Sequence, residues 1–520
     1  MCLLLCKAYT KNRIFKHMSL IKKYLLPVGV YVGFAFCAAS CRHDPPVITN
    51  PPIDPAKTQY PLEVAKILAT KCATAGCHNE ASYTGAAGLR MDDWQYLFDG
   101  GVNGAVAVPY SPENSSLMYF LNPGAGVYDN ISVQPTMPYN QAPLSKDEYN
   151  IIKTWLQNGA PDKNGNIPFA SNADTRQKAY LTQQGCDLVA VIDAEKKVVM
   201  RYIKAGIVGD KIESPHFVQV DKNGEYAYVC FVDGSYIQKI DTRTDKIVGE
   251  VSLAAFGGGT NFNILQLSDD GKKLVTSQLT GSGAIVTINT ANMTIASSLA
   301  TLKYPHGIAP NKTFDTFYVT GQYGNTVYKV VAGASVQNIS IDNKPSSTIS
   351  TPTSPDPHEI IMSPDYSKYF LTCEKTYEVR VMDRLGDSLL KVIPVGIKPQ
   401  EVAISNVQPY LFVTCMEDIS QVSALFRGSV YVINYNTLEL VKRIDGTFYQ
   451  PHGITVDDRD GKFYVVSRNI SSDGPTPHHT SNCGGRNGYY QVYDINTLAP
   501  ASNRCEVTPD PYSINMRFKN

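Results

Sequence analysis

The stretch Pro305-His306-Gly307-Ile308-Ala309, followed by Phe317-Tyr318-Val319-Thr320, contains the pattern that decides the fold of this chain. A Pro-His pair leads into alternating apolar residues, then a turn, then an aromatic-rich segment. Alternation with a period of two, bounded by turn residues, is typical of β-strands. The stretch therefore predicts two neighbouring strands of a small antiparallel sheet.

The same pattern recurs along the chain. Its copies begin at Pro215-His216, Phe262-Asn263, Pro305-His306, Pro357-His358, Pro399-Gln400, Pro451-His452 and Pro511-Tyr512. The second residues of these pairs, which we call the anchors, follow one another at intervals of 42 to 60 residues. One four-stranded propeller blade takes about 40–50 residues, so the seven copies predict seven blades.

The two ends of the repeat region complement each other. Residues 178–205 contain three strands that lack an inner strand, whereas residues 511–518 contain an inner strand that lacks the outer three. Pairing them closes a ring over residues 175–520 and removes exposed strand edges. The larger part of this multidomain chain is therefore predicted to be an all-β, seven-bladed β-propeller.

The repeats resemble the YVTN family of seven-bladed propellers, and Tyr318-Val319-Thr320 comes nearest to the sequence that gives the family its name. The resemblance extends over the whole of residues 175–520. It implies the propeller fold and leaves the function open, because one fold hosts many functions.

Four of the nine histidines, His216, His306, His358 and His452, occupy equivalent anchor positions. An anchor at the start of an innermost strand is expected to point towards the central channel at one mouth. Converging neutral imidazoles suit copper, zinc or iron, so a metal or second cofactor at this mouth is one interpretation. The alternatives are hydrogen bonds from each histidine to the backbone of a neighbouring blade, and a substrate pocket.

Two blades have long connections between their second and third strands, at residues 416–427 and 471–487. Both connections are expected to overhang the mouth that the anchors define. Cys483 and Cys505 flank the outer strands of one blade and are a candidate disulfide pair in an oxidising compartment.

Residues 60–165 have a different character, with helical patterns between loops. Cys72 and Cys77 enclose four residues and are followed directly by His78. Two thiols beside an imidazole suit covalent haem attachment, in which each thiol adds to a vinyl group and the histidine binds the iron. The common signature has only two residues between the cysteines, and Gly76 would permit the longer loop to bulge. The alternative is a disulfide between Cys72 and Cys77 beside an incidental histidine.

A low-spin haem needs a second axial ligand, which in electron carriers is usually a methionine thioether. Met137, in the segment Gln134-Pro135-Thr136-Met137-Pro138, is the best candidate. Met91 and Met118 are rival ligands. A bis-histidine iron is a further alternative, although no histidine lies near Met137 in the sequence.

A helix is predicted after Met137. Ser145 and Glu148 have the spacing of a capping box, and Ile152, Trp155 and Leu156 then share one helical face that ends at Gly159. Together with the Cys-His and Met-Pro motifs and residues 111–115 (Ser-Pro-Glu-Asn-Ser), this pattern resembles a class I cytochrome c domain of the fused, periplasmic type. The resemblance implies a small all-α domain with one covalent haem c. It makes Cys72 and Cys77 the thioether attachments, His78 the proximal ligand and Met137 the distal ligand.

The N-terminus indicates export. Residues 1–40 contain six Lys or Arg and no acidic residue, and a second possible start at Met18 precedes Lys22-Lys23 and the apolar run 24–39. This is the pattern of a secretory signal. Residues 38–41 (Ala-Ala-Ser-Cys) resemble a bacterial lipoprotein cleavage site, which implies a lipid on Cys41 and a tether over residues 41–59. Ordinary signal cleavage is the alternative.

The 47 basic and 47 acidic residues leave no net charge, which argues against a nucleic-acid partner. The leading hypothesis is a membrane-tethered haem protein of the bacterial periplasm or cell envelope. It would exchange single electrons with a redox protein or a small molecule, with the propeller as a platform for a partner or substrate. The alternatives are an oxidoreductase with its chemistry at the propeller mouth, and an interaction module with a redox-sensing haem.

Overall fold

The computed structural model describes residues 52–207, 209, 211–256, 261–331, 335–348, 351, 353–418, 426–469 and 483–518. The predicted signal region 1–40 with Met18, the lipidation site Cys41, the start of the tether and most of both long connections lie outside these residues. Among the helices of the described residues, none is long and apolar enough to cross a membrane.

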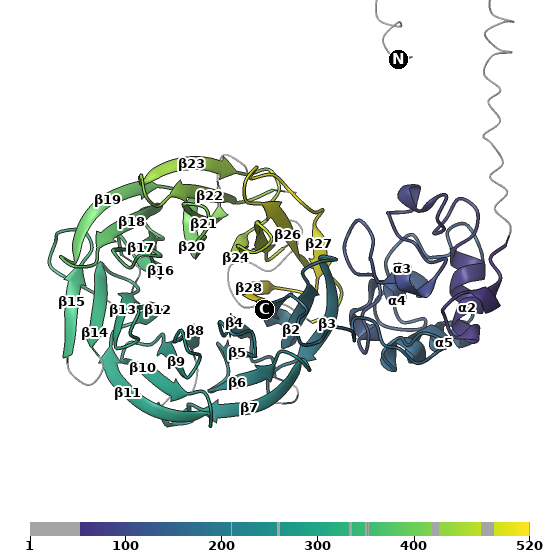
Figure 1. The fold of residues 1–520 in the computed structure, drawn as a ribbon, viewed down its shortest axis with the longest axis horizontal. Coiled ribbons are helices and arrows are strands. Elements are labelled where there is room, and N and C mark those ends of the chain that lie inside the picture. The colour runs from purple at the N-terminus through teal and green to yellow at the C-terminus, as the bar shows by residue number, and fades with distance from the viewer. Residues whose placement is uncertain are drawn as a thin grey trace, which may run out of the picture. The chain divides into compact units, whose positions relative to one another are not determined.

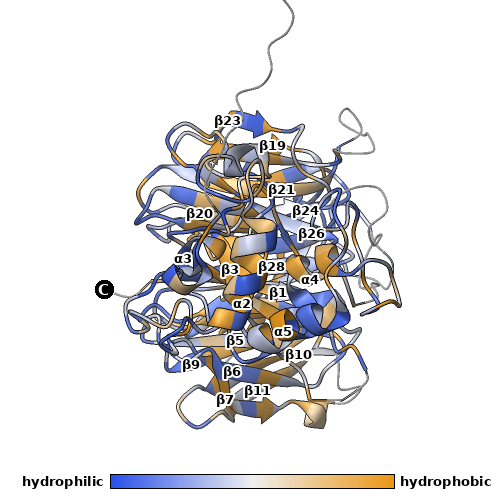
Figure 2. Ribbon diagram, turned by 90° about the vertical axis from the view of Figure 1, so that its right-hand side faces the viewer, coloured by the Kyte–Doolittle hydropathy of each residue, from blue (hydrophilic) through white to orange (hydrophobic). Residues whose placement is uncertain are grey.

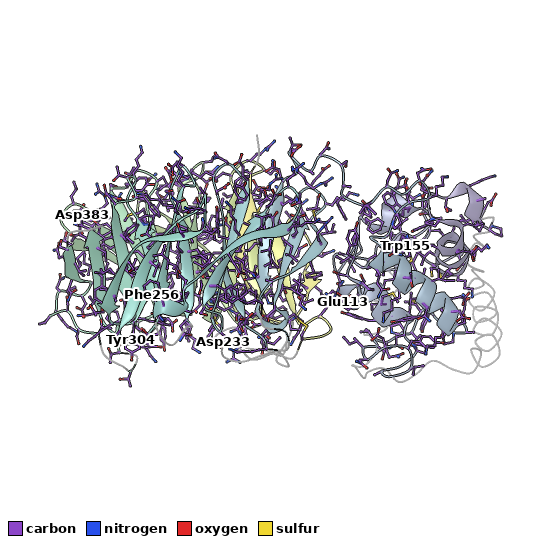
Figure 3. All side chains as sticks on the ribbon, turned by 90° about the horizontal axis from the view of Figure 1, so that it is seen from below. Glu113, Trp155, Asp233, Phe256, Tyr304 and Asp383 are labelled. Atoms are coloured by element: carbon purple, nitrogen blue, oxygen red, sulfur yellow. A yellow bond between two sulfur atoms is a disulfide. The ribbon has the colours of Figure 1, made fainter. Side chains whose placement is uncertain are left out.

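Short helices and loops form the segment before the propeller. The helices are η1 (Pro55–Lys57), α2 (Leu62–Ile67), the π-type turn η2 (Leu68–Cys72), η3 (Tyr83–Gly85), α3 (Trp94–Leu97), η4 (Pro112–Asn114), α4 (Ser116–Leu121) and α5 (Lys146–Gln157). Their apolar side chains share one core, which contains Leu68, Leu97, Leu121 and Trp155. Trp155 is labelled in Figure 3. We call this segment the helical region; its assignment to a cytochrome family stays a prediction.

Helix α5 begins with the predicted capping box. The Ser145 hydroxyl accepts a hydrogen bond from the Glu148 backbone N–H, and the Glu148 carboxylate accepts one from the Ser145 backbone N–H. Both bonds satisfy N–H groups that a helix start otherwise leaves unpaired. Figure 2 shows both hydrophobic and hydrophilic residues on α5, whose apolar face packs into the core of the helical region.

Seven four-stranded antiparallel sheets form the propeller (Figure 1). The strands of each blade are given from the innermost to the outermost. Blade 1 consists of β28 (Pro511–Arg517), β1 (Lys178–Gln183), β2 (Leu188–Asp193) and β3 (Val198–Lys204), and blade 2 of β4 (Pro215–Val220), β5 (Tyr226–Phe231), β6 (Tyr236–Asp241) and β7 (Lys246–Ser252). Blade 3 consists of β8 (Phe262–Leu267), β9 (Lys273–Gln278), β10 (Gly283–Asn289) and β11 (Thr294–Leu302). Blades 4 and 5 are β12 (Pro305–Pro310), β13 (Thr316–Gly321), β14 (Thr326–Val331), β15 (Ser335–Ser340); and β16 (Pro357–Met362), β17 (Lys368–Cys373), β18 (Glu378–Asp383), β19 (Ser388–Pro394). Blades 6 and 7 are β20 (Ile397–Ile404), β21 (Tyr410–Glu417), β22 (Ser429–Asn434), β23 (Glu439–Ile444); and β24 (Pro451–Asp457), β25 (Lys462–Ser467), β26 (Gly488–Asp494), β27 (Cys505–Val507).

The ring closes through its two ends. Strand β28, the last of the described strands, pairs antiparallel with β1, from Lys178 opposite Arg517 to Gln183 opposite Pro511. The innermost strands of successive blades contact one another around the whole ring, including β24 with β28 and β28 with β4. The prediction of a seven-bladed propeller is confirmed, and its C-terminal strand completes the first blade as the ends of the repeat region indicated.

A hydroxyl group on the second strand of a blade ties that blade to the next. Thr320 on β13 accepts a hydrogen bond from the backbone N–H of Gly307 in its own blade and donates one to the carbonyl of His358 in blade 5. Equivalent donors to the carbonyl of the following anchor are Thr182, Ser277, Thr372 and Thr414. Thr recurs in the motif because its hydroxyl group bridges two blades at a buried position.

A buried ion pair lies at the seam between blade 7 and blade 1. The guanidinium of Arg468, after β25, donates to both carboxylate oxygens of Asp510, before β28, at 2.6 and 2.9 Å. The two side chains are 0% and 1% exposed. A bidentate pair of this kind fixes orientation as well as distance, so it sets the position of the closing strand.

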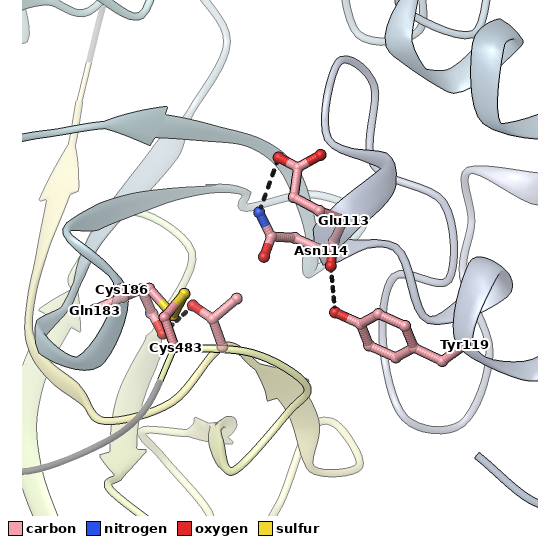
Figure 4. The surroundings of a disulfide bond; sticks show 7 residues. Glu113, Asn114, Tyr119, Gln183, Cys186 and Cys483 are labelled. Carbon is pink, nitrogen blue, oxygen red and sulfur yellow. Dashed lines mark hydrogen bonds between the residues drawn. A yellow bond between two sulfur atoms is a disulfide. The ribbon is translucent and has the colours of Figure 1, made fainter. Parts of the chain in front are cut away.

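A disulfide crosses the same seam. Cys483, before β26 of blade 7, is bonded to Cys186 in η5 (Gln184–Cys186) of blade 1 (Figure 4). The predicted pair of Cys483 with Cys505 is wrong. Cys505 lies on the outer strand β27, and its thiol is buried 3.5 Å from the carbonyl of Lys197, whereas Cys483 lies in the connection between the second and third strands. The corresponding connection of the neighbouring blade holds Cys186.

We expect Asp510→Ala to destabilise the protein by about 3–5 kcal/mol, because it leaves the Arg468 guanidinium buried without its counter-ion. Glu439→Ala is the matched control, since it removes an ion pair with Lys391 whose side chains are 38% and 70% exposed. An exposed pair contributes about 0–1 kcal/mol. Chemical denaturation of both variants measures the difference, and equal losses of stability would contradict the role assigned to the seam.

Candidate functional site

The helical region contains a cavity of about 600 Å³. Its lining includes Cys72, Cys77, His78 and Met137, the four residues that the sequence predicts to hold haem. Much of the remaining wall is apolar, formed by Val106, Leu117, Phe120, Leu121 and Val133 among others. The structure thus brings the four residues together at one cavity, which we call the cysteine cavity; their haem assignment stays a prediction.

His78 is held by its backbone surroundings. Its Nδ1 lies 3.1 Å from the carbonyl oxygen of Leu89 and can only donate there, which leaves the lone pair on Nε2. Burial lowers the pKa of His78 below its ordinary value, against the opposing effect of the Leu89 hydrogen bond. A neutral ring with its proton fixed on Nδ1 is prepared to act as a metal ligand through Nε2.

The two cysteines lie at the end of η2 and in the loop that follows it. Cys72 is buried and Cys77 is partly exposed, and both are free thiols. The loop turns back at Gly76, whose φ is +81°, and the backbone N–H of His78 donates to the carbonyl of Cys72 at 3.1 Å. The four-residue spacing is therefore accommodated by a glycine with a positive φ, as expected from the sequence.

The three candidate methionines differ in their relation to the cavity. The backbone N–H of Met137 donates to Phe120 of α4 at 2.8 Å, whereas that of Met91 donates to the carbonyl of His78 at 2.7 Å. Met91 therefore belongs to the wall that carries His78, and Met137 to a wall that contacts α4. Met118 is buried and is not among the lining residues. Met91 and Met137 thus reach the cavity from different backbone surroundings, and the choice of Met137 as the distal ligand stays a prediction.

Two residues of the propeller also line the cysteine cavity. Arg486 donates to the carbonyl of Ala105, and the backbone N–H of Glu506 donates to the carbonyl of Asn103 at 3.0 Å. Burial raises the pKa of Glu506, while the charge of Arg486 lowers it. No local sequence pattern marks these two residues, because only the packing of the helical region against blade 7 brings them to the cavity.

Several of the anchors have aromatic side chains in contact with one another. All seven anchors are buried. The aromatic ring centroids of His306 and His358 are 4.2 Å apart, and the ring centroid of Tyr512 lies 4.3 Å from that of His216 and 3.6 Å from that of His452. The ring nitrogen of His216 is 2.7 Å from the side-chain nitrogen of Gln184 in the neighbouring blade. In blade 2 the histidine thus bonds across a blade boundary, in line with a structural role.

Comparisons with known proteins give little beyond the fold. No protein-family model and no curated protein matches the chain. Solved structures that resemble it include a functionally unknown protein from Desulfotomaculum acetoxidans, at 12% identity and a TM-score of 0.49, which covers 66% of this chain and 99% of that one. Others are Kuenenia stuttgartiensis hydrazine synthase (16% identity, TM-score 0.43, 57% and 80% covered) and the dihydro-haem d1 dehydrogenase NirN in complex with DHE (12%, 0.44, 80% and 94%). Sequence identities and TM-scores this low do not indicate a function for this chain.

The burial of Cys72 predicts a strong pH dependence of its reactivity. Desolvation, followed by the neighbouring Cys77, raises the pKa of the Cys72 thiol to about 12. Since only the thiolate reacts, alkylation of Cys72 in protein made without haem is expected to be very slow at pH 7 and to rise about tenfold per pH unit up to pH 10. Peptide mapping after iodoacetamide treatment of Cys77→Ser measures this rate. Fast alkylation of Cys72 at pH 7 would contradict the buried position.

Proposed function

We propose that this chain is an exported haem c protein that transfers single electrons, with the propeller as a rigid platform for its redox partner or substrate. The single observation that supports this most is the cysteine cavity, where two thiols, an oriented imidazole and a thioether line one largely apolar space. Those four side chains belong to segments up to 65 residues apart in the chain, so the motif alone does not bring them together.

The residues present fit a haem group. The thiols of Cys72 and Cys77 would form the two thioether bonds, and His78 and Met137 would be the protein ligands of the iron. The carbonyl of Leu89 holds the His78 ring with Nε2 available, and Leu117 and Leu121 give the cavity an apolar wall suited to a porphyrin. When bound, haem supplies an iron centre that cycles between ferrous and ferric states, a one-electron change.

The residues around the cavity have distinct tasks in this proposal. The Leu89 carbonyl keeps the proton of His78 on Nδ1 and makes Nε2 a stronger donor. A low-dielectric lining disfavours the more highly charged state of the site, and a thioether ligand favours reduced iron. Arg486 and Glu506 bring propeller side chains to the same cavity, so a partner bound to blade 7 lies close to the redox centre.

The cell-envelope location belongs to the same proposal. A signal over residues 1–40 and a lipid on Cys41 would tether the protein to a membrane, with residues 41–59 as the link. The described disulfide between Cys186 and Cys483 suits an oxidising compartment. The exchange partner would be a second redox protein or a small electron donor or acceptor.

Covalent attachment is tested by making the full-length protein in a bacterial host that can ligate haem to exported proteins. The wild type is expected to retain its haem after denaturation, because thioether bonds survive unfolding. Cys72→Ser/Cys77→Ser is expected to lose it under the same conditions. A colourless wild-type protein, without the added mass of a porphyrin, would refute the proposal.

The distal ligand has its own test. Met137→Ala is expected to keep the covalent haem, to lose the weak far-red absorption that reports iron–thioether bonding and to lower the reduction potential, since a methionine ligand raises it. Met118→Ala is the matched control, because this buried side chain does not line the cavity. If the absorption disappeared in Met91→Ala and persisted in Met137→Ala, the assignment of Met137 would be wrong.

A further inference from the structure

Three metal-binding side chains gather at the boundary between blades 4 and 5 of the propeller. One donor atom from each of His306, His358 and Glu359 lies within 4.8 Å of the other two. All three side chains are buried, at 3–4% exposure. The cluster lies outside the helical region and is formed by residues that the cysteine cavity does not use.

The local backbone explains why Glu359 joins two anchors. In a regular strand the side chain that follows an anchor would point to the opposite face. The pairing of β16 with β17 shifts register between Pro357 and Ile360, a bulge that breaks this alternation. His358 and Glu359 therefore both approach His306 of the neighbouring blade, whose ring lies against that of His358.

Two atoms of the cluster have no hydrogen-bond partner among the described residues: Nδ1 of His306 and Oε1 of Glu359. They lie 3.4 Å apart, a separation at which no hydrogen bond forms between them in this geometry. Buried polar atoms are almost always satisfied, and each one left unpaired costs about 1–3 kcal/mol. Both atoms are potential metal ligands, and they are close enough to bind the same ion.

The carboxylates of the cluster have no basic ion-pair partner among the described residues. Oε1 of Glu374 is 3.5 Å from Nε2 of His358 and accepts a hydrogen bond from the Gln400 side chain at 2.9 Å. Within the described parts of the chain, no lysine or arginine forms an ion pair with Glu359 or Glu374. Buried carboxylates are normally paired with a cation or coordinate a metal. A divalent ion would satisfy the unpaired atoms and supply the missing charge.

We propose that the propeller binds one divalent transition-metal ion of the zinc class between blades 4 and 5, through His306, His358 and Glu359. Two imidazoles and one carboxylate are a ligand set that Zn²⁺ accepts in tetrahedral sites. Three protein ligands leave the fourth position for a water molecule. Glu374 is a positioning residue that orients the His358 ring through Nε2.

The test is metal analysis of full-length, haem-loaded protein that has been incubated with Zn²⁺ and dialysed. The wild type is expected to retain one zinc per chain, and His306→Gln and Glu359→Gln are expected to retain none. Glu374→Gln is expected to bind zinc about 10–100-fold more weakly, as the loss of a residue that orients a ligand typically does. Circular dichroism checks that each variant is folded, and Glu359→Gln preserves the shape of the side chain.

Two controls separate this site from others. His216→Gln changes an equivalent anchor whose ring already bonds Gln184, so it is expected to keep the zinc. Cys72→Ser/Cys77→Ser removes the other group of candidate ligands and is also expected to keep it, whether or not haem attachment occurs in the wild type. A wild type that binds no zinc, or a folded Glu359→Gln that binds it as the wild type does, would overturn the proposal.

Discussion

The antiparallel pairing of β28 with β1 is the constraint on which the rest of the structure depends. It joins the last described strand to the first strand of the propeller, so that β1 has a partner on both sides. The bidentate contact of Arg468 with Asp510 and the disulfide of Cys186 with Cys483 reinforce the same seam. Because the helical region also packs its Ala105 and Val108 against blades 1 and 7, the position of the cysteine cavity depends on this closure too.

Much of the fold could be predicted from the sequence because one sequence pattern recurs seven times and forms a blade each time. Each copy buries the same pattern, and a Thr near the end of the second strand has the same bridging contact in several blades, as at Thr320 and Thr372. The disulfide could not be predicted in this way. Cys483 and Cys505 are close in sequence and flank one blade, but cysteine pairing depends on which connections meet at a blade boundary, and Cys186 lies 297 residues from its partner.

At the candidate sites, too, the sequence indicates residues of a local motif but not residues that only the tertiary structure brings together. Cys72, Cys77 and His78 form a continuous motif, and the residue type of Met137 and its position before a helix indicate a ligand. The sequence alone therefore predicts that these four residues belong to one site. Arg486 reaches the cysteine cavity only through the packing of two regions. The sequence does not indicate Glu359, because strand alternation places the residue after an anchor on the opposite face, and a bulge in β16 reverses that expectation.

The closing strand has a consequence for how the protein is made. Thr182 of β1 and Ser513 of β28 hydrogen-bond across a separation of 331 residues. At typical rates of translation, on the order of 15 to 65 seconds pass between the synthesis of these two segments. Throughout that interval the nascent first blade has only three of its strands and an open edge, which other β-rich chains can pair with. The ring can therefore close only after β28 has been made, and until then β1 lacks its inner partner.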